Sequence, residues 1–171
     1  QMVACRYAKM NKSKSNITSG GLGTMGYGLP AAIGAAFGDP ERTTIAVIGD
    51  GGFQMTIQEL GTIMQFKPKV KLLILNNNFL GMVRQWQQLF HEKRYSFVDI
   101  QSPDFVQVAK GYGIPGQSIS KRPELKAALQ AMIDYDGSYL LEVMVGKENN
   151  VFPMVPQGRG VSEIVLSKEE I

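Results

Sequence analysis

The chain has 171 residues, the size of one ordinary domain, and 44% of them are hydrophobic, which is enough to build a core. The formal net charge is +3, but the lysines, Lys69 and Lys71 among them, are scattered and not interleaved with aromatic residues. We therefore interpret them as solvated or domain-facing charges, which excludes a nucleic-acid partner. No apolar run reaches the roughly 18 residues of a membrane span and no signal peptide opens the chain, so no membrane partner is expected. The one cysteine, Cys5, excludes a disulfide framework and is expected to be a small buried residue on a helix.

The sequence alternates helix-period segments with apolar strands. In chain order the predicted elements are a helix over residues 2–10, a glycine-rich segment over 18–28, a helix over 29–37, a strand over 44–48, a helix over 56–65, a strand over 70–75, a helix over 79–90, a helix over 102–112, a strand over 114–119, a helix over 122–134 and a strand over 138–145. Pro30 stands in the first turn of its helix, where its missing N–H removes no hydrogen bond, and the small residues that follow predict close packing against a sheet.

This alternation predicts an α/β fold, a doubly wound open parallel sheet with helices on both faces, in a single domain. Residues 1–146 are assigned to that domain. Residues 147–171, rich in Asn, Pro and Gly, are assigned to a C-terminal tail that is either flexible or a lid over the active site.

Two of the predicted strands end in polar residues. Gly49-Asp50-Gly51 follows the strand over 44–48, and Asn76-Asn77 follows the strand over 70–75, with 24 residues between the two motifs. Ligands of open parallel sheets bind beyond the carboxyl ends of the strands. Mg²⁺ takes one or two carboxylates, other oxygens and substrate phosphates, and glycines let a backbone approach a phosphate closely. The pattern therefore predicts a site for Mg²⁺ and a diphosphate cofactor.

Taken alone, each of the two motifs is more often an ordinary turn at the end of a strand. The joint pattern is stronger, because Gly-Asp-Gly followed by Asn-Asn at this interval resembles the signature of enzymes that bind thiamine diphosphate. Three longer stretches narrow the resemblance to one family. They are SGGLGTMGYGLP at 19–30, GDGGFQMTIQEL at 49–60 and NNNFLGMVRQWQ at 76–87.

These stretches resemble the catalytic subunits of acetohydroxyacid synthases (acetolactate synthases), and the similarity runs along nearly the whole chain. The Gly-Asp-Gly and Asn-Asn motifs are shared by thiamine enzymes in general, whereas GMVRQWQ at 81–87 is narrower. The resemblance implies that the chain is the C-terminal domain of a three-domain enzyme. In that family this domain binds the diphosphate end of thiamine diphosphate.

The resemblance also implies a role for individual residues. Asp50, the Asn77 carboxamide and the backbone carbonyl of Phe79 would ligate Mg²⁺. Gly51 and Gly52 would offer backbone N–H groups to the phosphates, near a helix start whose dipole favours anions. The implied cofactor-binding set is completed by Gly23, Met25, Gly49, Gly81 and Met82.

Two further side chains carry implied functions. Met25 resembles the bulky wedge that bends the cofactor, and backbone groups of Gly23 and Met25 would contact its pyrimidine ring. Holding the two rings of the cofactor together is catalysis by orientation, so Met25 is the one residue to which we assign a catalytic role. Trp86 is interpreted as a contact for the second 2-keto acid, although a lone tryptophan on an amphipathic helix is more often a core residue.

The implied parent enzyme joins a two-carbon unit from pyruvate to a second 2-keto acid, at the first committed step of branched-chain amino acid biosynthesis. In this family the glutamate that activates the cofactor lies in the N-terminal pyrimidine domain of a second subunit, in a homodimer or tetramer, and FAD binds mainly in the middle domain. Because the chain opens at Gln1, inside a family motif, we expect a fragment that is inactive alone. A small regulatory subunit is a further expected partner, and the expected location is cytoplasmic in a bacterium or organellar in a eukaryote.

Two alternative functions stay open. One is another thiamine-dependent carboligase or decarboxylase, such as glyoxylate carboligase, and Trp86 argues against it. The other is a binding module without catalytic activity that takes a nucleotide or a diphosphate. The length of the resemblance favours the enzyme.

Overall fold

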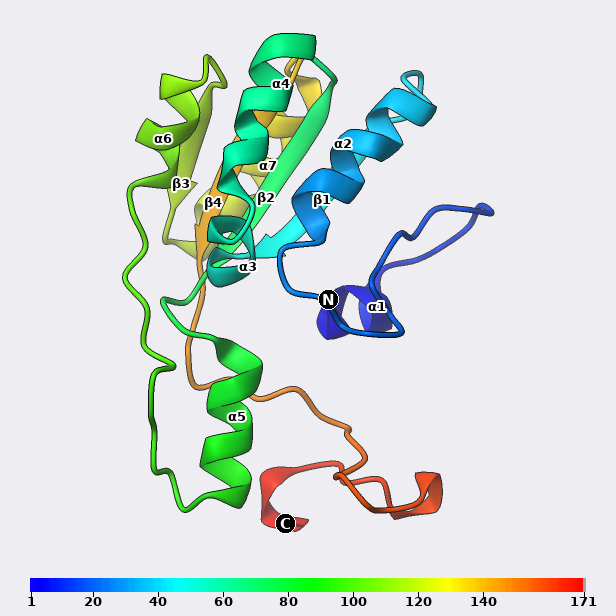
Figure 1. The fold of residues 1–171 in the computed structure, drawn as a ribbon, viewed down its shortest axis with the longest axis vertical. Helices are drawn as coiled ribbons and strands as arrows, with labels where there is room; N and C mark the ends of the chain where they lie inside the picture. The colour runs from blue at the N-terminus through cyan, green and yellow to red at the C-terminus, as the bar shows by residue number, and fades with distance from the viewer. Residues whose placement is uncertain (171) are drawn as a thin grey trace.

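The computed structural model describes residues 1–170, which form a four-stranded parallel sheet covered by helices (Figure 1). The strands are β1 (Thr44–Gly49), β2 (Val70–Asn76), β3 (Gly116–Ile119) and β4 (Tyr139–Met144), and their order in the sheet is β1-β2-β4-β3. Every neighbouring pair is parallel. The two central strands, β2 and β4, are almost continuously apolar, because strands in the middle of a parallel sheet are covered on both faces.

Helices cover both faces of this sheet, which confirms the predicted doubly wound α/β fold. α2 (Gly28–Gly38), α4 (Leu60–Phe66) and α6 (Phe105–Gly111) lie on one face, and α7 (Leu125–Asp134) lies on the other (Figure 1). The chain moves outward from β1 through β2 to β3 and then returns to β4. Right-handed crossovers that run in opposite directions place their helices on opposite faces, which explains the change of side.

The larger core lies between the sheet and the face covered by α2, α4 and α6. Ala32 and Ala36 of α2 are buried, so this helix approaches β1 closely, as its small residues predict. α4 follows a single 3-10 turn, η1 (Ile57–Glu59), and ends where Lys67 adopts a left-handed φ of 52°. The remaining short elements are α3 (Asp50–Gln54), η2 (Arg122–Glu124), η3 (Val161–Glu163) and η4 (Lys168–Glu170).

Two predictions about single residues are wrong. Cys5 is exposed, because α1 (Met2–Tyr7) buries none of its residues. Lys71 is only 4% exposed and is not a solvated charge. Its ammonium group donates to the backbone carbonyl oxygens of Tyr135 and Gly137, just beyond the end of α7, and burial lowers its pKa. These carbonyls provide the partners that a buried polar group requires.

α5 (Gly81–Phe90) stands apart from the sheet, below it in Figure 1, and the first residues of the tail are held against it. Gln85 pairs with the backbone of Val151: its Oε1 accepts from the N–H at 2.7 Å and its Nε2 donates to the carbonyl oxygen at 3.2 Å. Arg84 donates to both carboxylate oxygens of Glu148, at 2.9 and 3.0 Å. The function of the tail as a lid stays a prediction.

The rest of the tail folds back on itself and onto α1. Met154 and Val165 exchange two backbone hydrogen bonds of 2.9 and 2.8 Å. Arg6 donates to the backbone carbonyl oxygens of Phe152 and Pro153. Among residues 1–170, no helix is long and apolar enough to cross a membrane.

Candidate functional site

The carboxyl ends of β1 and β2 bring the Gly-Asp-Gly and Asn-Asn motifs together. Gly49 lies beside Leu75 in the register of the two strands, so the chain leaves them at Asp50 and Asn76 as neighbours. A Cβ atom added to Gly51 would lie 2.7 Å from Leu80 Cδ2, so the loop that follows β2 packs directly on this glycine. The two motifs adjoin each other because parallel strands end at the same edge of a sheet.

Asp50, the first residue of α3, is only 2% exposed. Ser102 Oγ donates to its Oδ2 at 3.2 Å, and the backbone N–H groups of Asp50, Gly51 and Asn77 also favour its charged form. Burial outweighs these donors and raises the pKa of Asp50 above its ordinary value. The carboxyl group is therefore surrounded by hydrogen-bond donors but remains costly to ionise.

The loop after β2 is shaped by two consecutive side-chain turns. Asn76 Oδ1 accepts from the Asn78 N–H at 3.0 Å, and Asn77 Oδ1 accepts from the Phe79 N–H, also at 3.0 Å. Between them Asn78 has a left-handed φ of 58°, which asparagine tolerates better than most residues. Gly81 lies against the Asn77 carboxamide, since a Cβ there would be 3.4 Å from Asn77 Nδ2, an ordinary van der Waals contact.

The backbone oxygen of Phe79 is not used by the pairing that anchors this loop. Leu80 N–H donates to Val98 O at 2.9 Å, and Ile100 N–H donates to Asn78 O at 3.0 Å. At the start of α5, the N–H of Arg84 donates to Leu80 O. These bonds hold the loop on both sides of Phe79 and leave its carbonyl oxygen as a candidate ligand.

This set of oxygens fits Mg²⁺. None of the ion pairs within residues 1–170 includes Asp50, so no lysine or arginine balances its buried charge there. A divalent cation would supply the balancing charge. One carboxylate and two neutral oxygens, from Asn77 and Phe79, leave coordination positions for phosphate and water, as Mg²⁺ prefers. Elsewhere in the described part of the chain, no three His, Cys, Asp or Glu side chains form a cage for a metal.

The glycine-rich segment reaches the same edge of the sheet from the side of α3. Gly23 and Gly26 both have left-handed φ angles, 62° and 85°. Gly26 packs on the residues that follow α3, since an added Cβ would lie 3.1 Å from Thr56 Cγ2, and Thr56 Oγ1 donates to Gly26 O at 2.9 Å. Met25 lies between these glycines and is 49% exposed. Its side chain is therefore free to contact a ligand, and its function as a wedge stays a prediction.

Trp86 lies farther along α5. Its ring stacks on that of Phe90, one turn later, with 4.7 Å between the ring centroids and a tilt of 35°. Met82 and Val83, at the start of the same helix, are exposed. Within residues 1–170 Phe90 is the aromatic partner of Trp86, and no hydrogen bond ties Trp86 to the loop after β2. The substrate contact assigned to Trp86 therefore stays a prediction.

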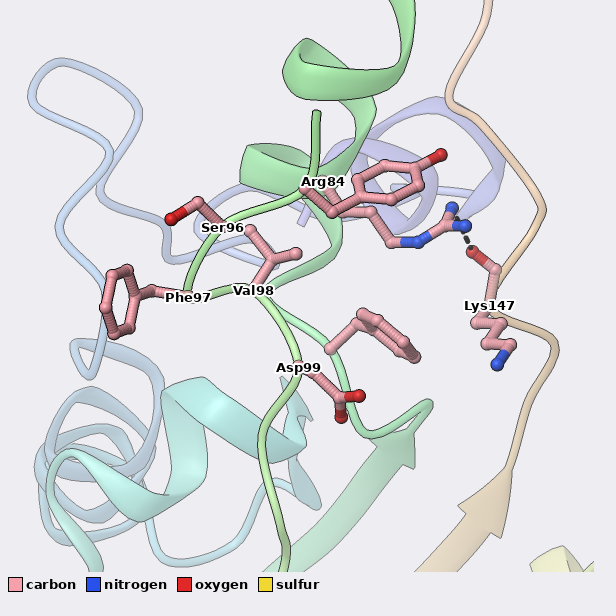
Figure 2. Close-up of a pocket in the computed structure, with 8 residues that line it drawn as sticks. Arg84, Ser96, Phe97, Val98, Asp99 and Lys147 are labelled. Carbon is pink, nitrogen blue, oxygen red and sulfur yellow. Dashed lines mark hydrogen bonds between the residues drawn. The ribbon is translucent and has the colours of Figure 1, made fainter. Parts of the chain in front are cut away.

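Phe79 contributes its side chain as well as its backbone. Phe79 lines a pocket of about 340 Å³ together with Arg84, Lys147 and the segment over 95–99. Figure 2 shows Arg84 and Lys147 on one side of this pocket and the segment over 96–99 along another. The Arg84 guanidinium lies 5.2 Å from the Phe79 ring centroid and 4.6 Å from that of Tyr95. The Lys147 ammonium lies 5.2 Å from the Phe79 ring centroid. The Phe79 ring therefore links the loop after β2 to the start of the tail. A residue that ligates a metal only through its backbone carbonyl would need no particular side chain, but the Phe79 side chain has contacts of its own.

Three features of the site escape the sequence pattern. The residues that form α3 look like a turn, because glycine is a poor helix former. Ser102, which donates to Asp50, stands in a loop far along the chain. Glu142, which accepts from Asn76, stands in an otherwise apolar strand. In the sequence, the only sign of this contact is a charged residue at a position where the pattern predicts burial.

The fold and the geometry of this edge are those of an α/β domain whose ligand lies beyond the carboxyl ends of parallel strands. The family described as thiamine pyrophosphate enzyme, C-terminal TPP binding domain, matches residues 1–143, and the chain belongs to this family.

Curated relatives carry the names of one enzyme. The chain is 45% identical over 166 residues to the acetolactate synthase isozyme 2 large subunit of Escherichia coli. This match covers 96% of this chain and 30% of that protein. It is 46% identical over 171 residues to the mitochondrial acetolactate synthase catalytic subunit of Saccharomyces cerevisiae, which covers 100% of this chain and 25% of that protein. The chain thus spans less than a third of the length of these relatives.

A solved structure supports the fold. The thiamine diphosphate-dependent 4-hydroxybenzoylformate decarboxylase of Rhodococcus jostii RHA1 superposes with a TM-score of 0.67 at 33% sequence identity. The superposition covers 71% of this chain and 23% of that one.

Proposed function

We propose that this domain binds Mg²⁺ and thiamine diphosphate for an acetolactate synthase. The enzyme would condense two pyruvates, or pyruvate and 2-ketobutyrate, with loss of carbon dioxide, in the biosynthesis of branched-chain amino acids. The main support is the juxtaposition of the buried Asp50 with the loop that presents Asn77 and the Phe79 carbonyl oxygen. The names of the relatives support the choice of synthase, because their identity of 45% and 46% extends over nearly the whole chain.

The protein's task in such an enzyme is to hold and orient the cofactor, which itself supplies an electron sink for the decarboxylation of 2-keto acids. Asp50, Asn77 and the Phe79 carbonyl oxygen would hold Mg²⁺, whose charge would attract the diphosphate. Gly51 and Gly52 let the backbone approach the phosphates, and the exposed start of α5 at Gly81 and Met82 adds free N–H groups that favour an anion.

The glycine-rich segment would orient the rest of the cofactor. The exposed Met25 would press against the cofactor and hold its two rings close together, which is catalysis by orientation. The backbone of Gly23 would contact the pyrimidine ring. Trp86, stacked on Phe90, would border the side chain of the second 2-keto acid.

The remaining parts of the enzyme would come from elsewhere. A second subunit of a homodimer or tetramer would provide a pyrimidine domain with the activating glutamate, FAD would bind mainly in another domain, and a small regulatory subunit would control the assembly. The tail over 147–171 would act as a lid. The enzyme would be cytoplasmic in a bacterium or organellar in a eukaryote.

The direct experiment is an assay of the full-length protein with pyruvate, thiamine diphosphate, Mg²⁺ and FAD, in which acetolactate is measured. We expect acetolactate, with Asp50→Ala inactive and the 171-residue chain inactive alone. Carbon dioxide release from pyruvate without acetolactate would indicate a decarboxylase. Condensation of glyoxylate in preference to pyruvate would indicate a different carboligase. Either result would contradict the proposal.

A further inference from the structure

A buried polar pair lies directly beneath the loop after β2. Asn76, at the end of β2, is 3% exposed, and Glu142, in the central strand β4, is 7% exposed. Asn76 Nδ2 donates to Glu142 Oε1 at 2.7 Å. Their strand neighbours Ile74 and Leu140 are fully buried core residues. A carboxylate in such a position is costly unless it has a specific partner, so the pair is more than a surface contact.

The pair supports the turn of the chain that contains the proposed metal ligand Asn77. Asn76 Oδ1 accepts from the Asn78 N–H at 3.0 Å, and its backbone oxygen accepts from the Val145 N–H at 2.8 Å. Asn78 adopts the left-handed conformation that turns the chain, and in the next turn Asn77 Oδ1 accepts from the Phe79 N–H. The conformations of Asn77 and Phe79, the two proposed ligands in this loop, therefore depend on how the Asn76 carboxamide is oriented.

A carboxamide has a donor end and an acceptor end of nearly the same shape, so its orientation is set by its partners. The Glu142 carboxylate accepts and does not donate, and it therefore selects the orientation in which Asn76 Nδ2 points to β4. The oxygen then points to the Asn78 N–H. With an apolar residue at position 142, Asn76 Nδ2 would be buried without an acceptor. A different orientation of the Asn76 side chain would then be lower in free energy.

We propose that Glu142, acting through Asn76, is a positioning residue that holds the loop over 76–79 in the conformation that binds the metal. The metal part of this inference rests on the proposed function. The effect on the loop itself does not, because the hydrogen bonds that carry it are formed between groups of the chain itself.

A set of variants at the two positions tests the proposal in the full-length protein. Glu142→Leu removes the acceptor, and Glu142→Gln keeps an acceptor of the same shape. Asn76→Asp keeps the acceptor for the Asn78 N–H but faces Glu142 with a second carboxylate, and Asn76→Asp combined with Glu142→Gln restores a donor–acceptor pair in reverse. Leu141→Ala is the matched control, because Leu141 is fully buried next to Glu142 but packs on the opposite face of the sheet.

The first readout is the affinity for Mg²⁺ at saturating thiamine diphosphate, measured by calorimetry. Loss of a group that hydrogen-bonds a metal ligand typically weakens metal binding by about 10–100-fold. Glu142 and Asn76 act one step further from the ligands, so we expect Glu142→Leu and Asn76→Asp to weaken Mg²⁺ binding by about 10-fold, the lower end of that range. Glu142→Gln and the double variant should recover most of the affinity. Leu141→Ala should lose stability and keep its affinity for Mg²⁺. A folded Glu142→Leu protein with the affinity of the parent, or an equal loss in Leu141→Ala, would overturn the proposal.

The second readout is hydrogen exchange of the Asn78 amide in the metal-free protein, measured by NMR. We expect faster exchange in Glu142→Leu than in either the parent or Leu141→Ala, and unchanged exchange would overturn the proposal even if the metal data agreed with it. If the full-length protein without substitutions fails to bind Mg²⁺ with thiamine diphosphate, the proposed function is contradicted. The exchange measurement then still decides whether Glu142 positions the loop.

Discussion

Replacing Gly51 by alanine should crowd the loop after β2, because the added methyl group would meet side chains that pack there. Its carbon would lie 2.7 Å from Leu80 Cδ2 and 3.1 Å from Ile100 Cδ1. Both atoms are the far ends of flexible side chains that can shift, so the cost should not exceed the roughly 1–3 kcal/mol that is typical of overpacking. Gly51 also lies within α3, where a change from glycine to alanine gains about 1 kcal/mol. The expected net loss in the free energy of unfolding is therefore about 0–2 kcal/mol.

Because this net value is small, the informative quantity is the coupling to Leu80. In a Leu80→Ala background the added methyl group has space, so Gly51→Ala should be harmless or stabilising. The double-mutant cycle, measured by urea unfolding, should give a coupling of about 1–3 kcal/mol.

Gly34→Ala on α2 is the matched control. This glycine is exposed and an added Cβ would meet no atom within 4 Å, so the substitution should stabilise the helix by about 0.5–1 kcal/mol. A coupling between Gly51 and Leu80 that is indistinguishable from zero, within about 0.3–0.5 kcal/mol, would refute the packing of the two motifs on each other.

Further predictions concern the carboxylate, the tail and the substrate contact. Burial raises the pKa of the Asp50 carboxyl group above its ordinary value of 3.8. Between the pKa of the unfolded chain and that of the folded metal-free protein, the folded state therefore keeps a proton that the unfolded state has released. The free energy of unfolding should fall as the pH rises through this range. Asp50→Asn should remove this pH dependence in urea unfolding and raise metal-free stability at neutral pH, and a slope like that of the parent would contradict the assignment. Gln85→Leu removes both hydrogen bonds to Val151, so limited proteolysis should cut the tail faster while the unfolding of the sheet is unchanged, and equal cleavage rates would show that α5 does not hold the tail. In the full-length protein, Trp86→Leu should reduce the preference for 2-ketobutyrate over pyruvate by about 10-fold or more, measured as the product ratio under competition, and an unchanged ratio would leave Trp86 a packing residue.

The meeting of Asp50 with the Asn-Asn motif could be predicted because it depends on a property of all parallel sheets. Apolar strands of that length pair in parallel when helices connect them, and their carboxyl ends then share one edge. The burial of Lys71 and the exposure of Cys5 could not be predicted in the same way, because each depends on which distant group covers the residue. Lys71 is buried only because the carbonyl oxygens beyond α7 reach its ammonium group.

The same reasoning explains why the predicted site was incomplete. The motif residues follow their strands directly. Ser102 reaches the site through a long loop, and Glu142 reaches it because β4 pairs with β2 in the sheet. The sequence pattern also does not predict that α5 stands apart from the sheet. An amphipathic helix indicates that one face is covered but does not indicate what covers it, and here part of the cover is the tail, through Arg84 and Gln85.

The central claim is that Asp50 and the loop over 76–79 hold a metal-bound diphosphate. Calorimetric titration of the 171-residue chain with thiamine diphosphate, with and without Mg²⁺, tests it most directly, with the Asp50→Ala variant and the Gly34→Ala control measured alongside. The account predicts weak binding that requires Mg²⁺, is lost in Asp50→Ala and is kept in Gly34→Ala. Equal binding by the parent chain and Asp50→Ala in the presence of Mg²⁺ would contradict it.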